Sequence, residues 1–322
     1  MSSVLTDIST YFPGEKHITA SAGLPIRYVA KALGLKFFST TAVTRKLYRM
    51  LGNTVAARRR ARLGQQIGHR QNGEWLVKQL YSLGFHQESH FRFLELGTGW
   101  LQFYSLYLKL HFPHAQGVAF DVWDNRSWDA LQERMHTMQQ EWLGLSDQQK
   151  LILEGWKGLR DIDEWNHRLG IEYIVNPEGA LENLESTSID IIVSMDVLEH
   201  IPQENLAQAI QEQHRILKRG GYAFHQIGLD DHLAHGNHAN KRQFLSVSRA
   251  RWKRYFQNRL QYFNCVPYSG FRCGFAASGF RELSASCERS PQELSKIVVD
   301  KDYDTWDQES LEAVRAAFVL QK

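Results

Sequence analysis

A short apolar run that ends in two glycines constrains this chain more than any other feature. Residues 93–100 read Phe-Leu-Glu-Leu-Gly-Thr-Gly-Trp, and an amphipathic segment follows at residues 101–110. The pattern predicts a buried strand, a tight turn and a helix, which is how open α/β sheets bind nucleotide-derived cofactors. Gly97 and Gly99 permit a backbone turn that larger residues would block, and they let a ligand approach the main chain.

Strand-like and helical patterns alternate along the rest of the chain. Residues 125–168 predict one or two helices, and residues 202–217 predict another. This alternation predicts an α/β fold with a mostly parallel sheet and helices on both faces. Ligands of such sheets bind beyond the carboxyl ends of the strands, so the residues that follow each strand are the candidates. Further strand-like runs lie at residues 115–122, 171–175, 189–194, 222–227, 280–287 and 314–320.

The glycine turn does not fit a nicotinamide or flavin site. That fingerprint requires a third glycine three residues after the second, and Gln102 occupies this position. The carboxylate of Glu95, just before the turn, would repel a pyrophosphate but suits a cofactor with positive charge. S-adenosylmethionine carries an ammonium and a sulfonium group, so it fits both observations.

Four motifs, in order, resemble those of the class I S-adenosylmethionine-dependent methyltransferases, especially their small-molecule (type 11-like) branch. The resemblance covers roughly residues 90–230. The motifs are Leu-Glu-Leu-Gly-Thr-Gly at 94–99, Phe-Asp-Val at 120–122, Asp-Ile-Ile-Val-Ser-Met-Asp-Val-Leu-Glu-His at 190–200 and Ile-Leu-Lys-Arg-Gly-Gly-Tyr at 216–222.

The resemblance implies a Rossmann-like sheet of seven strands and S-adenosylmethionine as the cofactor. It implies that the glycine turn meets the methionine part of the cofactor and that Asp121 accepts hydrogen bonds from the ribose hydroxyls. Glu178 is the candidate for the adenine amino group, although Asn176 and Pro177 depart from the usual pattern there. The cofactor-binding residues expected in this way are Glu95, Gly97, Thr98, Gly99, Asp121, Val122, Glu178, Gly179, Ser194 and Met195.

Three histidines are candidates for a general base. Methyl transfer to a sulfonium-activated carbon depends mainly on positioning, and a base is needed if the acceptor is a hydroxyl. His225 closes the predicted fifth strand and is expected to face the crevice, so it ranks first. His200 follows the fourth strand, where a hydrogen-bonded supporting role is at least as plausible as catalysis, and His232 lies in the next loop.

No metal site is expected from the sequence. The histidines at 232, 235 and 238 share a spacing of three, which would put them on one face of a helix. Gly236 and Asn237 argue against a helix there, and no cysteine or nearby carboxylate completes a structural zinc shell.

A basic and aromatic segment follows the fifth predicted strand. Residues 233–281 contain nine Lys and Arg but no Asp or Glu. Methyltransferases of this class often insert substrate-recognition elements here, so we expect a helical lid at residues 229–278. One interpretation is a lid whose basic face is merely solvated, and the other is a site for an anionic small molecule. The expected substrate-binding residues are Gln226, Asp231, Arg251 and Arg254.

Charge also separates an N-terminal extension, residues 1–75, from a methyltransferase domain at 76–322. Residues 1–75 hold 12 Lys and Arg against 3 Asp and Glu, a net of +9, whereas the whole chain has a net charge of +3. The cluster at residues 58–62 indicates a solvated helix face, or else a contact with an anionic substrate, a nucleic acid or a membrane surface. Three unevenly spaced cysteines and the absence of a signal-like N-terminus predict a cytoplasmic protein.

Three functions compete at this level. The first is transfer of a methyl group to an oxygen or nitrogen of a small, anionic or sugar-like molecule. The second is an RNA-directed methyltransferase that holds phosphates with the basic segments, and it ranks lower because no RNA-binding module is visible. The third is a non-catalytic protein that binds the cofactor.

Overall fold

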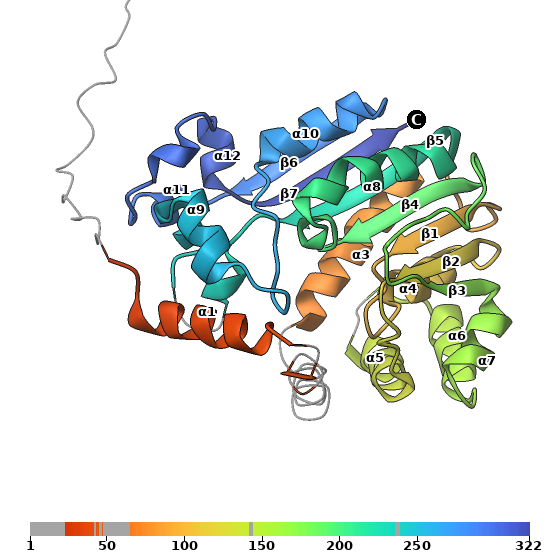
Figure 1. Cartoon of the computed structure of the whole chain (residues 1–322). Coiled ribbons are helices and arrows are strands. Elements are labelled where there is room, and N and C mark those ends of the chain that lie inside the picture. The colour runs from red at the N-terminus through yellow and green to blue at the C-terminus, as the bar shows by residue number, and fades with distance from the viewer. Residues whose placement is uncertain (1–22, 42, 45–46, 48–64, 142–143, 236–238) are drawn as a thin grey trace, which may run out of the picture.

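The computed structural model describes residues 23–41, 43–44, 47, 65–141, 144–235 and 239–322. A seven-stranded sheet with the order β3-β2-β1-β4-β5-β7-β6 forms its centre (Figure 1). Strands β1 to β5 pair in parallel, and β7 pairs antiparallel with both β5 and β6. The strands are β1 (Arg92–Leu96), β2 (Gln116–Asp121), β3 (Ile171–Val175), β4 (Ile189–Met195), β5 (Leu217–Gly228), β6 (Arg281–Arg289) and β7 (Ala313–Gln321).

Helices cover both faces of the sheet, as the alternating pattern predicts. Consecutive side chains of β1 point to opposite faces of the sheet, so Phe93 packs into one buried cluster and Leu94 into the other. The first cluster joins the sheet to α3 (Gln65–Ser82), α4 (Phe103–His111), α5 (Trp128–Glu141), α6 (Asp147–Lys157) and α7 (Ile162–Leu169). The second joins it to α8 (Gln203–Ile216) and α10 (Tyr268–Ala277).

The boundaries agree closely with the sequence pattern. All seven predicted strands form, and α3 ends just before Gly84, whose φ is +90°. Residues 125–168 hold three helices rather than one or two, because Ser146 and Asp161 each cap a new helix within that segment. Helix α3 runs across the expected boundary at residue 75, and the basic cluster at 58–62 lies outside the described residues.

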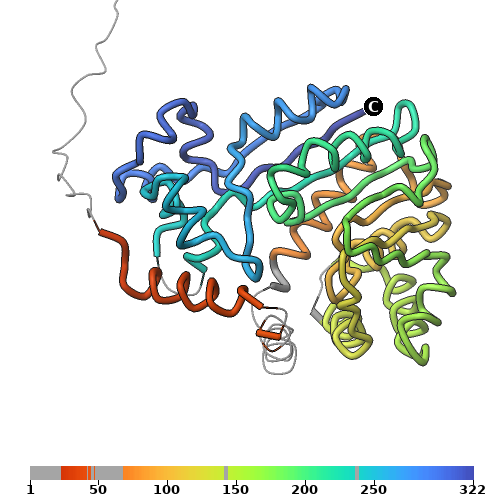
Figure 2. Tube along the Cα trace, in the orientation of Figure 1, coloured from red at the N-terminus to blue at the C-terminus, as the bar shows by residue number. Residues whose placement is uncertain are grey.

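Short helices fill the insertion between β5 and β6. They pack with α1 (Ile26–Phe38) around a third buried cluster that includes Tyr28, Phe244 and Trp252. Figure 2 shows α1 running along this insertion. The elements of the insertion before α10 are η2 (His232–Ala234), η3 (Gln243–Ser246), α9 (Arg249–Arg251) and the π-helical turn η4 (Trp252–Phe256). The remaining short elements are η1 (Leu198–His200), α11 (Pro291–Leu294), η5 (Lys301–Tyr303) and α12 (Gln308–Glu312).

Polar contacts hold α1 against the insertion. The Tyr28 hydroxyl donates to the Asp231 carboxylate at 2.6 Å, and Lys31 Nζ reaches the carbonyls of His232, Leu233 and His235 at 2.9–3.2 Å. The described part of the N-terminal region therefore completes the lid. No helix among the described residues is long and apolar enough to cross a membrane.

Candidate active site

The glycine turn lies between the carboxyl ends of β1 and β4. Gly97 has φ +74°, and a Cβ there would lie 2.4 Å from Cγ2 of Val197. Gly99 has φ +59° and no atom within 4 Å of the corresponding position, which leaves the backbone open to a ligand. A side chain at residue 97 would clash with Val197, and the positive φ at both positions favours glycine.

Asp121, at the end of β2, is tied directly to this turn. Its buried carboxylate accepts hydrogen bonds from the backbone N–H of Gly99 at 2.8 Å and of Trp123 at 3.2 Å. Burial raises the pKa of this carboxyl above its usual value. The loops after β2 and β3 also meet, because a Cβ on Gly179 would lie 3.6 Å from Val122. Glu178, in the same loop, is exposed.

An unsatisfied polar group marks the other end of the turn. Gln102 precedes α4 with φ +42°, is fully buried, and neither atom of its side-chain amide has a hydrogen-bond partner among the described residues. Buried amides normally form hydrogen bonds, so the Gln102 amide is available to hydrogen-bond with a ligand. Together with the open backbone at Gly99 and the acid at Asp121, it fits a cofactor with hydroxyl and amino groups.

Glu95 is placed differently from the expectation. Its carboxylate is buried and accepts hydrogen bonds from the backbone N–H of Tyr104 at 3.2 Å and from the N–H and hydroxyl of Ser105, the former at 2.7 Å. These donors lie in the first turn of α4, where free N–H groups attract negative charge. The carboxylate therefore holds the helix to the turn instead of facing a cationic cofactor.

A Glu95→Gln variant should change the pH dependence of stability. Burial raises the pKa of Glu95 to about 7, above the ordinary 4.5, so the folded protein holds a proton that the unfolded chain releases. The free energy of unfolding then falls as pH rises from about 5 to about 8, by about 3 kcal/mol from this group. Urea unfolding across this range should give a flatter profile for the variant. Glu178→Gln, on the surface, is the control, and identical slopes for Glu95→Gln and wild type would contradict the assignment.

His225 and Ser194 lie inside the sheet rather than in the crevice, which corrects the expected role of His225 as a base. His225 is fully buried, its Nδ1 lies 2.7 Å from the Ser194 hydroxyl, and its ring stacks on Phe275 at 5.2 Å. Burial lowers its pKa to about 3, so the ring stays neutral. The sequence places it near the end of β5, but only the pleat decides that it points into the core. Met195 is likewise buried.

A cavity of about 650 Å³ opens at the carboxyl ends of β4 and β5. It brings together His200 and His232, two of the three predicted catalytic histidines, whose rings lie 4.9 Å apart. Burial and the neighbouring His200 lower the pKa of His232 to about 3. The lining residues are Asp196, Glu199, His200, Gly228, Asp230, His232, His235, Lys241, Leu260, Gln261, Glu288, Val314 and Arg315.

Two of these lining residues form an ion pair that the sequence did not reveal. Asp196 has φ +57°, an unusual conformation at the end of β4, and its carboxylate pairs with Arg315 of β7 at 2.6 and 2.8 Å. The Leu-Glu-His motif pointed to this loop, but no local signal links Arg315 to it across 119 residues. Gln226, an expected substrate residue, is buried in β5, where its carbonyl accepts from Asp196 N–H at 2.9 Å.

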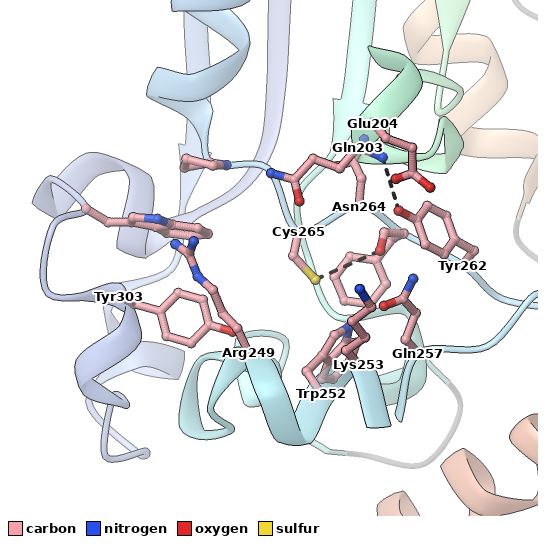
Figure 3. A pocket seen from close by; sticks show the side chains of 13 residues that line it. Gln203, Glu204, Arg249, Trp252, Lys253, Gln257, Tyr262, Asn264, Cys265 and Tyr303 are labelled. Atoms are coloured by element: carbon pink, nitrogen blue, oxygen red, sulfur yellow. Dashed lines mark hydrogen bonds between the residues drawn. The ribbon is translucent and has the colours of Figure 1, made fainter. Parts of the chain in front are cut away.

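A second cavity, of about 260 Å³, lies under the insertion (Figure 3). Arg249 and Lys253, one helical turn apart, line it, whereas the predicted Arg251 and Arg254 are exposed and line neither cavity.

The structure also corrects the expected role of Asp231 in substrate binding. Asp231 is fully buried and bonded to Tyr28 and to the N–H of Leu233, so it supports the lid instead of meeting substrate.

Comparisons with known proteins agree with this geometry. The sequence model of the methyltransferase domain family matches residues 157–225, which run from the end of α6 into β5. No curated protein sequence matches the chain. Residues 157–225 are thus similar to the methyltransferase domain family, and the sheet order and the glycine turn with its acid at β2 agree with the resemblance to class I S-adenosylmethionine-dependent methyltransferases that the sequence motifs predict.

Solved structures with similar folds share little sequence with this chain. A candidate sarcosine dimethylglycine methyltransferase from Galdieria sulphuraria is 15% identical, with 78% of this chain and 85% of that chain covered and a TM-score of 0.45. A phosphoethanolamine N-methyltransferase from Haemonchus contortus is 16% identical over 79% of this chain and 52% of that chain, with a TM-score of 0.42. A methyltransferase from Methanosarcina mazei is 13% identical over 76% and 96%, with a TM-score of 0.42.

Proposed function

We propose that the enzyme methylates an oxygen or nitrogen of a small polar molecule that is anionic or sugar-like. The cavity at the ends of β4 and β5 carries this proposal. Asp196 in its wall is followed directly by Val197, which contacts the glycine turn, so the cavity adjoins the cofactor site. Its size suits a small molecule, and its lining is largely polar, as a hydroxylated or charged acceptor requires.

The chain's own residues hold the cofactor and position the acceptor. Bound S-adenosylmethionine supplies a methyl group on a positively charged sulfur. Gly99 leaves the backbone open to the cofactor, and Asp121 offers its carboxylate to the ribose. Lys241 and Arg315 supply the positive charge of the cavity wall, and His200 and His232 have ring nitrogens that can accept a proton or bind a metal ion.

The test is a search for the methylated product. Labelled cofactor is incubated with fractionated small metabolites and, separately, with cellular RNA, and products are identified by mass spectrometry from the added methylene unit. A labelled small polar or anionic product supports the proposal. Label that enters only RNA, or no product at all, contradicts it.

If the methyl acceptor is anionic, a Lys241→Met variant should raise its KM by about 10-fold, because the charge-assisted contact between Lys241 and the acceptor is lost. Arg251→Met is the matched control, and it should leave KM unchanged because Arg251 is exposed and lines neither cavity. Steady-state kinetics of both variants measure this difference. A larger effect from Arg251→Met than from Lys241→Met would place the anion site on the outer face of the lid.

A further inference from the structure

We propose that Glu199, His200 and His232 form a binding site for a borderline divalent cation, such as Zn²⁺ or Co²⁺, that holds the methyl acceptor. One ligand atom from each side chain lies within 4.8 Å of the others, in the wall of the larger cavity. The metal site depends only on these side chains, whereas its part in methyl transfer rests on the proposed function. The sequence alone gave no reason to expect it.

Glu199 provides the strongest indication of a bound cation. Its side chain is 2% exposed, and Oε1 accepts a hydrogen bond from the N–H of Gly228 at 3.0 Å. Its second oxygen, Oε2, is buried without a hydrogen-bond partner among the residues that the structure describes. A buried carboxylate oxygen left unpaired is costly, and metal coordination is one of the few arrangements that satisfies it.

The two histidines have the geometry of metal ligands. His200 Nδ1 lies 2.6 Å from the carbonyl oxygen of Tyr262, so Nδ1 must carry the proton and Nε2 keeps its lone pair. A metal-binding histidine usually donates its other N–H to a carbonyl in this way. His232 Nε2 lies on the same side of Gly228 as the Glu199 carboxylate, because a Cβ built on Gly228 would lie 3.6 Å from Nε2 and 2.9 Å from Glu199 Oε1.

The backbone around the cluster is held in place by further hydrogen bonds. Asn264 is buried, its N–H donates to the carbonyl of Glu199 at 2.8 Å, and its side-chain amide donates to the carbonyls of Leu198 and Ile201 at 2.8 and 3.1 Å. Lys31 of α1 holds the carbonyl of His232 at 3.2 Å. Asn264 and Lys31 therefore hold in place the two turns that carry Glu199, His200 and His232.

Charge favours a cation in this cavity. Four carboxylates line it, those of Asp196, Glu199, Asp230 and Glu288, against the two cations Lys241 and Arg315. A divalent ion would offset the additional carboxylates and would allow an anionic acceptor to bind beside it.

The donor set indicates the kind of ion. Two imidazole nitrogens and one carboxylate oxygen suit Zn²⁺ and its neighbours better than Mg²⁺ or Ca²⁺, and they leave positions open for other ligands. Ligands about 2.1 Å from a tetrahedral ion lie about 3.4 Å apart, so the side chains need to close in by about 1 Å on binding.

The open positions fit an acceptor that chelates through a hydroxyl and an adjacent oxygen, as a hydroxy acid or a diol does. Binding to the cation lowers the pKa of the hydroxyl, and the proton leaves to water. The acceptor oxygen then forms a bond to the methyl carbon. The carbon–sulfur bond breaks with its electron pair retained by sulfur, giving the methyl ether and S-adenosylhomocysteine.

Metal binding is tested without reference to activity. Chelator-treated full-length protein is titrated with Zn²⁺ and with Co²⁺ by calorimetry, and the visible absorption of Co²⁺ reports its ligands. We expect one ion per chain, and a Kd weakened by about 100-fold or more in Glu199→Gln and His232→Gln. The control is His114→Ala, because the surface rings of His90 and His114 stack at 4.9 Å and could bind the metal adventitiously.

Circular dichroism and calorimetry of S-adenosylmethionine binding show whether the Glu199→Gln and His232→Gln variants remain folded. Metal binding that is unchanged in both variants, or that is lost only in His114→Ala, would overturn the site, as would tighter binding of Mg²⁺ than of Co²⁺. Full transferase activity in chelator-treated protein would overturn the link to the acceptor. Failure of the methyltransferase function itself would instead appear as missing product with the metal still bound.

Discussion

A Gly97→Val variant is expected to lose S-adenosylmethionine binding, with Kd weakened by about 100-fold or more. The residue has φ +74°, which costs about 1–2 kcal/mol for a side chain, and a Cβ there would lie 2.4 Å from Val197. Relief of that clash costs a further 1–3 kcal/mol or so and shifts the turn that must approach the cofactor. Calorimetric titration of the folded variant with S-adenosylmethionine measures the loss.

Gly220→Val is the control that distinguishes the effect of backbone strain from the effect of disrupting the cofactor site. Gly220 has nearly the same φ, +76°, but nothing lies within 4 Å of its Cβ position, and it precedes the main run of β5 far from the turn. This control should lose some stability yet bind the cofactor normally. Asp121→Ala, which leaves both glycines intact, should weaken binding by about 10-fold or more, because the charge-assisted contact expected between Asp121 and the ribose would be lost. Wild-type affinity in both Gly97→Val and Asp121→Ala would refute the cofactor site.

An Arg242→Met variant should lower the free energy of unfolding by about 3 kcal/mol. The guanidinium is 1% exposed and donates to the carbonyls of Leu311 at 2.8 Å, Ser310 at 2.9 Å and Leu229. Burial lowers the pKa of Arg242 to about 10, so removing the charge recovers part of its desolvation cost. Three buried carbonyls then lose their donor, at about 1–3 kcal/mol each, and this loss is the larger effect.

Urea unfolding measures this change, and Arg251→Met is the matched control. Arg251 lies in the same basic segment but is exposed, so its replacement should change the free energy of unfolding by about 0.5 kcal/mol or less. Equal stabilities for the two variants would show that Arg242 does not hold the insertion to α12 and β5.

The basic segment illustrates how far sequence reasoning reached. Its position predicted a lid between β5 and β6, and the structure places helical elements there. Its charge pattern did not reveal that Arg242 is internal, that Arg249 and Lys253 line a cavity, or that Arg251 is exposed. These differences depend on packing against α1 and α12, which composition does not encode.

The expected histidine base is a second case in which the sequence predicted the position in a strand but not the direction of the side chain. His225 and His200 are both at strand ends in the sequence, and the carboxyl end of β5 was the better guess for a substrate-facing residue. In the folded chain His225 points into the layer of α10, while His200 meets His232 from the lid. A difference of one residue in a strand reverses the side to which a side chain points, and the sequence pattern was not sharp enough to decide it.

The sequence by itself determined the strands, the glycine turn, the acid at β2 and hence the cofactor class, because these are properties of short segments. Apolar periodicity and glycine spacing are readable wherever they occur. The tertiary structure decided that Glu95 braces α4, that Asp196 pairs with Arg315, and that Glu199 joins His200 and His232. Those contacts join segments far apart in the chain, and they exist only because the sheet order and the lid bring the ends of β4, β5 and β7 together.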